Sequence, residues 1–208
     1  MPKKEAPIET LQQFLPAGTY DMIISYLRQH KVHLTVARKR NSILGDYRHK
    51  TNYTNHRISV NGNLNSYSFL ITLLHELAHL LTFEQFGNKV QSHGREWKNI
   101  YSQLLDHFLR SKLFPPEIEK ELLQSIHNPS ASSCAEEGLI RVLKKYDLNK
   151  SIHKLLEELP ASSIFRIEDG RVFKKGEKLR KRFKCTETRS GREFLFSPVY
   201  EVILVNSE

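Results

Sequence analysis

The amino-acid sequence of 208 residues predicts an α+β protein built from three parts. Apolar residues recur at the 3.6-residue period of a helix through much of the first two thirds of the chain. Short runs that alternate apolar and polar residues are typical of strands and are split by glycine-containing turns near the C-terminus. We therefore expect a mixed domain over residues 8–127, a helical connector over 128–162 and a small basic β-rich unit over 163–208.

The first domain is expected to begin with helical segments over residues 8–29, interrupted at residues 16–18, where Pro, Ala and Gly follow one another. Residues 32–36 alternate in the manner of a half-buried strand. Residues 43–47 and 57–61 also resemble strands, and a polar loop separates them. These runs predict a small sheet beside the helices.

A long helix is predicted from about Ser66 to Phe86, because the segment is almost continuously apolar. Ser66 is a suitable N-cap residue, and Gly87-Asn88 supplies the usual end of a helix. Another amphipathic helix is expected to start near His93. The long helix is expected to pack on the small sheet.

The connector is expected to begin with a polar linker and to continue as a helix. A helical piece is predicted from residue 115 to residue 126, and the linker over residues 128–135 is the best candidate for a domain boundary. The pattern of residues 135–159 is again helical. After residue 163 the alternating runs predict a small antiparallel β unit.

Composition excludes several classes of protein. No run reaches the roughly 18 consecutive apolar residues that span a bilayer, and the basic N-terminus has no apolar run behind it. Cys134 and Cys185 cannot build a disulfide framework. We therefore expect a cytoplasmic protein with reduced thiols and no membrane partner. The net charge of +9 favours an anionic partner, of which nucleic acid is the commonest.

The segment His75-Glu76-Leu77-Ala78-His79 lies within the predicted long helix. Two imidazoles four residues apart share one helix face, and this spacing suits two ligands of a tetrahedral Zn²⁺. Glu76 is placed to take a proton from a metal-bound water and pass it to a leaving amine. Because unpaired polar groups are costly in an apolar helix, a metal would compensate for their burial. The motif therefore predicts one zinc ion and hydrolytic chemistry.

A catalytic zinc needs a third protein ligand and one open position. His93 is the best candidate, because it lies just beyond the predicted end of the long helix, where the chain can turn back. Glu84 is poorly placed, since it lies more than a turn past His79. Glu96 and His107 remain alternatives.

Three segments together resemble the SprT-like domain family, which includes bacterial SprT proteins and the eukaryotic DNA–protein-crosslink protease Spartan. They are the strand-like residues 58–61, the segment 73–79 and the downstream pattern His93-Gly94-x-x-Trp97. The resemblance covers roughly residues 15–125.

The resemblance implies a zincin-like metallopeptidase domain, with His75, His79 and His93 as metal ligands and Glu76 as the catalytic acid and base. It also implies a role in DNA–protein crosslink repair. Many members carry a C-terminal zinc ribbon built from four cysteines. This chain has only Cys185 in that region, so we expect a single zinc.

Residues 171–184 hold eight Lys or Arg against one Glu, and Phe173 and Phe183 interleave with them. Two interpretations stay open. The segment is either a surface that binds phosphates and stacks an unpaired base, or a solvated charged face whose Phe residues form the local core. The candidate nucleic-acid-binding residues are Lys174, Lys175, Lys178, Arg180, Lys181, Arg182 and Lys184.

The expected reaction is zinc-assisted hydrolysis of peptide bonds, with flexible segments of unfolded or DNA-associated proteins as substrate. Tyr47, Tyr53 and His56 precede the long helix on a possible edge strand that a peptide could extend. Tyr53 or Tyr101 could stabilise an oxyanion. The alternatives are a non-catalytic, zinc-stabilised nucleic-acid-binding protein and a metallohydrolase that acts on non-peptide amides.

Overall fold

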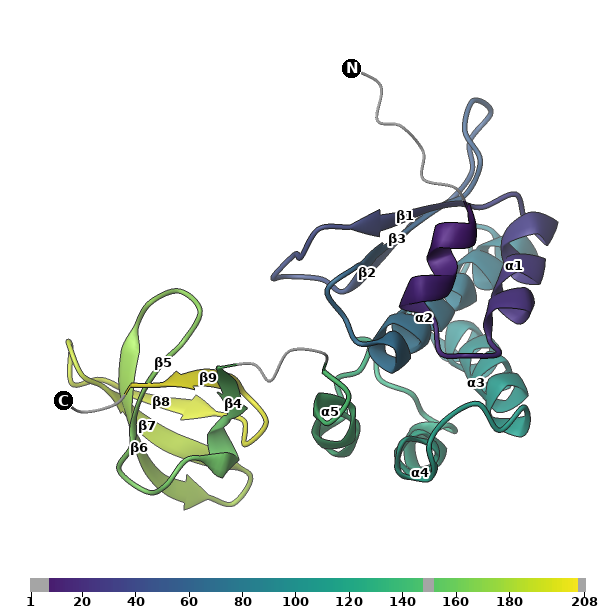
Figure 1. Ribbon diagram of the computed structural model, residues 1–208. Helices are drawn as coiled ribbons and strands as arrows, with labels where there is room; N and C mark the ends of the chain where they lie inside the picture. Colours follow the sequence, from purple (N-terminus) through teal and green to yellow (C-terminus); the bar gives the residue numbers. More distant parts are fainter. Residues whose placement is uncertain (1–7, 148–151, 206–208) are drawn as a thin grey trace. The chain divides into compact units, whose positions relative to one another are not determined.

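The computed structural model describes residues 8–147 and 152–205, and the chain forms two compact units, Met1–Tyr146 and Asp147–Glu208 (Figure 1). The expected α+β class is confirmed. The first unit contains η1 (Ile8–Phe14), α1 (Tyr20–Gln29), β1 (His33–Ala37), β2 (Gly45–Arg48), β3 (Arg57–Asn61), α2 (Ser66–Phe86), α3 (Arg95–Arg110), α4 (Pro116–Ser125) and α5 (Glu137–Lys144). In the described part of the chain, no helix combines the length and the apolar character needed to cross a membrane.

The sheet of the first unit has the strand order β1-β3-β2. Strand β1 runs parallel to β3, with Leu34 opposite Ile58, and β2 runs antiparallel to β3, with Tyr47 opposite the same Ile58. Strand β2 is therefore an edge strand, and one of its sides has no strand partner within the sheet. Ile58 and Val60 of the central strand are buried, because they face the core.

Helix α2 forms the centre of the first unit and contacts β2, β3 and α3. The helix is apolar on every side, as a helix surrounded by other elements must be. Its predicted bounds are confirmed, but the expected cap is wrong, because the side chain of Asn65, and not that of Ser66, accepts the Ser68 N–H. The helix ends at Gly87, whose φ of 60° is accessible to glycine without strain.

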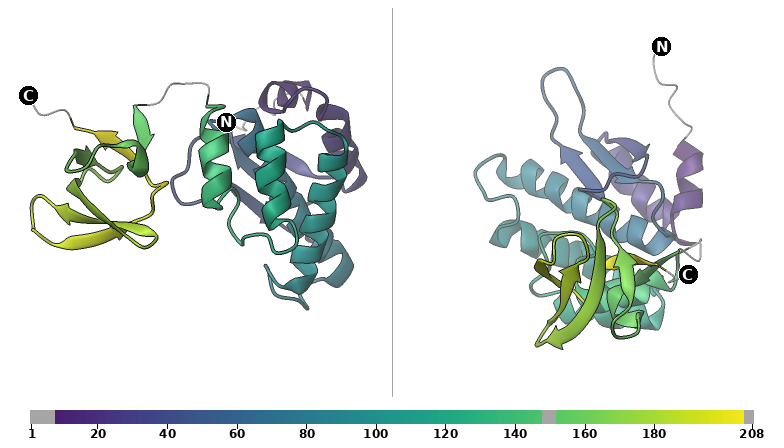
Figure 2. Two further views of the ribbon diagram at one scale, coloured as in Figure 1. Left: turned by 90° about the horizontal axis from the view of Figure 1, so that it is seen from below. Right: turned by 90° about the vertical axis from the view of Figure 1, so that its left-hand side faces the viewer.

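Helices α4 and α5 lie beside each other and complete the core of the first unit (Figure 2). Leu139 and Leu143 of α5 are buried in that core. The Asn65 side chain also donates a hydrogen bond to the Leu143 carbonyl, which ties the end of α5 to the start of α2. Helix α5, which lies within the expected connector, therefore belongs to the first unit.

Helix α5 ends at Lys144, and the expected helical pattern over residues 135–159, of which 148–151 lie outside the described residues, is wrong for residues 153–155. Residues 153–155 instead form a strand, β4, that pairs with the last strand of the chain. Leu155, Leu156 and Leu159 are buried in or beside the core of the second unit. Short apolar runs fit a strand as well as a helix, and here tertiary packing decides between them.

The second unit confirms the expected antiparallel β unit and contains β4 (His153–Leu155), η2 (Leu156–Glu158), β5 (Ile164–Arg166), β6 (Val172–Leu179), β7 (Arg182–Glu187), β8 (Glu193–Phe196) and β9 (Glu201–Leu204). The strands follow the order β4-β9-β5-β6-β7-β8. Its core is aromatic, since Phe165 and Phe173 are fully buried and stack on each other. Cys185 is buried in the same core as a free thiol.

Candidate metal centre

The three predicted histidines come together in the first unit. His75 and His79 project from one face of α2, and His93 reaches them from the segment between α2 and α3. The Nε2 atom of His75 lies 3.2 Å from that of His79 and 3.3 Å from that of His93. Among the described residues, these three side chains form the group that can hold a metal ion, with ligand atoms within 4.8 Å of one another.

The spacing of the nitrogen atoms fits a metal. A tetrahedral zinc with Zn–N bonds of 2.0–2.1 Å holds its nitrogen ligands about 3.3 Å apart. Hydrogen bonding explains the cluster less well. If one proton bridges the Nε2 atoms of His75 and one of its two partners, the Nε2 atom of the other partner has no proton to share with His75. The donor set is all imidazole, which suits zinc and several other transition metals.

Packing, rather than hydrogen bonding, holds the ring of His75 on its other side. Its Nδ1 atom is buried and has no hydrogen-bond partner in the described structure. The ring instead lies against Trp97 and Tyr101 of α3, with centroid distances of 4.7 and 5.5 Å. The Trp97 ring is also 4.7 Å from that of His93. Helix α3 therefore forms the floor under the histidine cluster.

The electrostatics keep the histidines neutral, which is the form that binds a metal. Burial, with a further contribution from the neighbouring histidines, lowers the pKa of His75 to about 3. Burial also lowers the pKa of His79 to about 4, and His93 adds to the effect. The pKa of His93 is lowered as well, chiefly by burial. At neutral pH the cluster therefore presents lone pairs and no positive charge.

Glu76 is buried beside the cluster and faces the edge strand. Burial raises the pKa of its carboxyl to about 8; Asp46 adds to the rise and Arg40 opposes it. A Cβ atom at Gly45 of β2 would lie 2.5 Å from the Glu76 Oε1 atom, so the strand passes as close to this carboxyl as glycine allows. A metal cation nearby would favour the charged form of Glu76. The arrangement thus places a proton-accepting group between three potential ligands and an open strand edge.

Sequence reasoning missed two residues that shape this carboxyl's surroundings. The sequence pattern predicts Gly45 only as part of a strand and predicts no role for Arg40. Arg40 is held by hydrogen bonds from its guanidinium to Asn61 (2.7 Å) and Ser59 (3.0 Å) of β3. An isolated Gly inside a strand pattern, which marks a close backbone approach, was the available signal for Gly45.

Other candidates for the site lie elsewhere. Glu84 binds Lys50 and His56, away from the histidine cluster, and Glu96 and His107 are outside the group that can hold a metal. Tyr53 is 95% exposed in the loop between β2 and β3, so the structure does not bring it to the cluster. Tyr101 is buried under His75 as part of the floor.

The predicted nucleic-acid residues do not share one surface. Lys175 is only 5% exposed, and its Nζ atom donates to the carbonyl oxygens of Leu159 (2.5 Å) and Glu157 (3.4 Å). Lys184 pairs with Glu193 at 2.9 Å.

Of the two interpretations left open for the aromatic residues, the structure bears on their packing: Phe173 is fully buried, and Phe183 is partly buried against the core. Both Phe residues therefore contribute to the local core, as the second interpretation expects.

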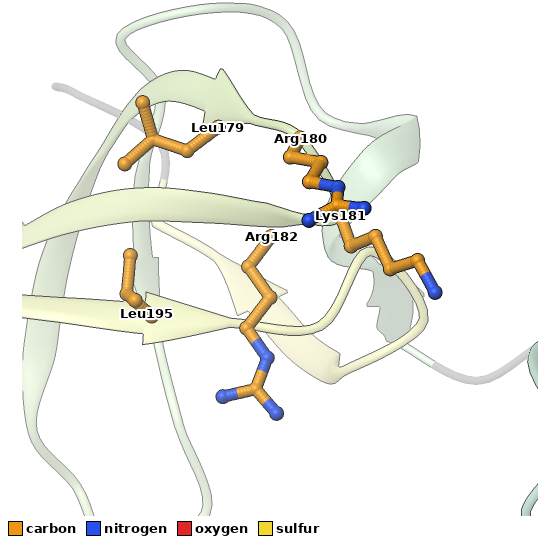
Figure 3. A pocket seen from close by; sticks show the side chains of 5 residues that line it. All are labelled: Leu179, Arg180, Lys181, Arg182 and Leu195. Carbon is orange, nitrogen blue, oxygen red and sulfur yellow. The ribbon is translucent and has the colours of Figure 1, made fainter.

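Exposed cations remain at the end of the β6–β7 hairpin (Figure 3). Arg180, Lys181 and Arg182 surround a shallow concavity of about 320 Å³ that Leu179 and Leu195 complete. The three cationic side chains leave the hairpin in different directions and do not meet over the leucines. This end of the hairpin is therefore a diffuse positive surface and not a clamp for one phosphate.

Comparison with known proteins gives two matches. The model of the SprT-like family matches residues 14–119, just over half of the chain. Protein SprT of Glaesserella parasuis serovar 5 (strain SH0165) is 58% identical over 31 residues, which are 15% of this chain. The match spans only 19% of that protein's own length. No solved structure matches the chain.

Proposed function

Because the chain belongs to the SprT-like family, we propose that it is a zinc-dependent metallopeptidase whose metal is held by His75, His79 and His93. One observation carries the proposal: the His75 Nε2 atom lies 3.2 and 3.3 Å from those of His79 and His93, close to the spacing in a tetrahedral zinc site, with the buried Glu76 beside them. A purely structural zinc site tends to close its fourth position with a protein ligand and has no need of such a carboxyl.

Glu76 is proposed as the general base and acid. A bound zinc would polarise the substrate carbonyl and lower the pKa of a water toward about 7. The Glu76 carboxylate then accepts the proton of the attacking water and delivers it to the nitrogen of the leaving amine. The apolar surroundings that raise its pKa in the absence of a cation also exclude bulk water from this transfer.

The substrate is proposed to be an extended protein segment that lies along β2. Among the described residues, one side of this edge strand has no strand partner, and Gly45 brings the strand against Glu76. A segment that adds to the strand would bind through its backbone and with little demand on its sequence. Such binding requires a flexible or unfolded chain. Association with DNA-bound proteins is a further proposal, supported by the net charge of +9 and the exposed hairpin cations.

The experiment compares the wild-type protein with Glu76→Gln on a disordered protein substrate. We expect about one zinc per molecule in both and cleavage only by the wild type. Glu9→Gln is the matched control, because Glu9 is an exposed carboxyl of η1, and it should cleave like the wild type. Equal cleavage by Glu76→Gln would refute the acid and base role, and protein without bound metal would remove the whole proposal.

The main rival is a zinc-stabilised nucleic-acid-binding protein without activity, and the exposed cations of the hairpin favour it. The same comparison separates the two functions. A structural zinc would leave the wild type unable to cleave, with Glu76→Gln indistinguishable from it in stability and DNA affinity.

A further inference from the structure

A hydrogen-bonded network lies beside the histidine cluster and is not used by the chemistry above. Its centre is His56, which is 2% exposed on its side chain. The His56 Nε2 atom lies 3.0 Å from the Glu84 Oε1 atom, and its Nδ1 atom lies 2.8 Å from the Tyr47 hydroxyl. Lys50 binds Glu84 at 2.6 Å. The network links β2, the residue before β3, and α2.

The direction of each hydrogen bond follows from the chemistry of its groups. The hydrogen bond from Lys50, with that from His56, holds the pKa of Glu84 below its usual range, so this carboxylate only accepts. Burial lowers the pKa of His56, so the ring is neutral and carries its proton on Nε2. The Nδ1 atom therefore accepts, and the Tyr47 hydroxyl donates to it.

The Tyr47 hydroxyl thus has its proton fixed by His56, and its free lone pairs can only accept. The Lys50 backbone N–H also donates to His56 Nδ1, at 3.3 Å. That nitrogen therefore acts only as an acceptor and cannot donate a proton to the Tyr47 oxygen. A phenol in this state cannot donate to an oxyanion. It can accept a hydrogen bond, such as one from a backbone N–H of a bound segment.

On β2, Tyr47 lies opposite His79 of α2, just as Gly45 lies opposite Glu76. Gly45 and Tyr47 are two residues apart on one strand, so their side chains share a face. Gly45 lies against Glu76, and the Tyr47 ring lies parallel to that of His79, with 6.4 Å between centroids and 4° between planes. Tyr47 is half-buried.

We propose that Tyr47 is a positioning residue for the substrate, supported by His56 and Glu84, and that it sets where a bound segment lies along β2. The inference rests on the proposed peptidase function and deepens it. The network fixes the end of β2 that lies beside His79, while the Gly45 contact fixes the end beside Glu76. Both ends must be held, because a reacting bond misplaced by about 1 Å costs on the order of a hundredfold in rate.

A buried network of this kind need not exist for stability alone. Buried polar groups are costly unless every partner is present, and apolar residues of the same shape often stabilise a fold equally well. The arrangement of Tyr47, His56 and Glu84 does supply one thing that apolar packing does not, which is a hydroxyl oriented as an acceptor at the edge strand.

The test uses Tyr47→Phe and Glu84→Gln, which keep the shape of each side chain. The probe is a fluorescein-labelled unstructured peptide that the wild type cleaves. Its affinity is measured by anisotropy in the inactive Glu76→Gln background, and kcat/KM is measured in the active one. Tyr146→Phe is the matched control, because it removes a tyrosine hydroxyl bonded to Glu117 at 2.7 Å in the same unit.

We expect Tyr47→Phe to weaken peptide binding about 3- to 10-fold, the loss that follows removal of one hydrogen bond, and to lower kcat/KM at least as much. Zinc content should not change. Glu84→Gln should act in the same direction, and the double variant should lose less than the two single losses combined, since both act through His56. Tyr146→Phe should lower the melting temperature without weakening binding.

Two outcomes would overturn the inference, and they are distinguishable. In the first, the wild type cleaves and Tyr47→Phe differs from it only in melting temperature, as Tyr146→Phe does. The network would then have only a structural role, and the proposed function would stand. A zinc-loaded wild type that cleaves no unstructured peptide removes the proposed function and this inference with it.

Discussion

Gly45→Ala adds a single methyl group at the closest contact between the edge strand and the site. The new Cβ atom would lie 2.5 Å from the Glu76 Oε1 atom, 2.8 Å from its Cγ atom and 2.8 Å from the Thr72 Cγ2 atom. Ordinary van der Waals contact begins at 3.4 Å, so the strand and the carboxyl must separate by about 1 Å. A displacement of this size at a reacting group predicts about a hundredfold loss of kcat/KM.

The assay for Gly45→Ala measures peptide cleavage, zinc content and melting temperature in parallel. Overpacking of this kind typically costs about 1–3 kcal/mol of stability, so a folded, zinc-loaded protein is expected. Gly87→Ala is the control: the added methyl meets nothing within 4 Å, and only its φ of 60° strains the backbone. Its φ of 60° and ψ of −139° lie near a region that only glycine adopts readily, so the variant should lose stability, by about 1–3 kcal/mol, and retain activity. Cleavage by Gly45→Ala within a few-fold of the wild type would contradict the expected hundredfold loss.

Three further predictions concern the metal and the hairpin. Chelation should lower the melting temperature by several degrees, because a ligand present at about a thousand times its Kd contributes about 4 kcal/mol, and His93→Ala should abolish this response. Replacing Arg180, Lys181 and Arg182 with Gln should weaken binding to single-stranded DNA and reduce the slope of log K against log salt by up to about 2. An unchanged slope would show that these cations do not contact DNA phosphates. Lys175→Met should alter the stability of the second unit but not that slope, since its Nζ atom is bonded to buried carbonyls.

The features that could be predicted from sequence are those that local patterns determine. The bounds of α2 follow from a continuous apolar run and a terminal glycine, and both signals agree with the structure. The meeting of His75, His79 and His93 follows from helical spacing and from a chain reversal after Gly87. In these cases the local preference and the tertiary fold favour the same structure.

The features that could not be predicted depend on contacts between distant segments. The approach of Gly45 to Glu76 exists only once β2 is packed on α2. The strand over residues 153–155, which lies within a predicted helix, depends on the pairing of β4 with β9, some 50 residues further along the chain.

The burial of Lys175 was available from the strand pattern, because it shares a face with the core residue Phe173. The net positive charge of the segment, taken alone, predicts that its cations act as one group. On a strand, however, successive side chains face opposite sides, so a basic run cannot place every cation on one surface.

The most direct measurement of the central claim is reconstitution of cleavage with zinc. The chelated wild-type protein should not cleave a disordered substrate, and one equivalent of zinc should restore cleavage. Glu76→Gln should bind the same equivalent and stay inactive. Cleavage that survives complete removal of the metal, or a Glu76→Gln protein that recovers activity with zinc, would contradict the account.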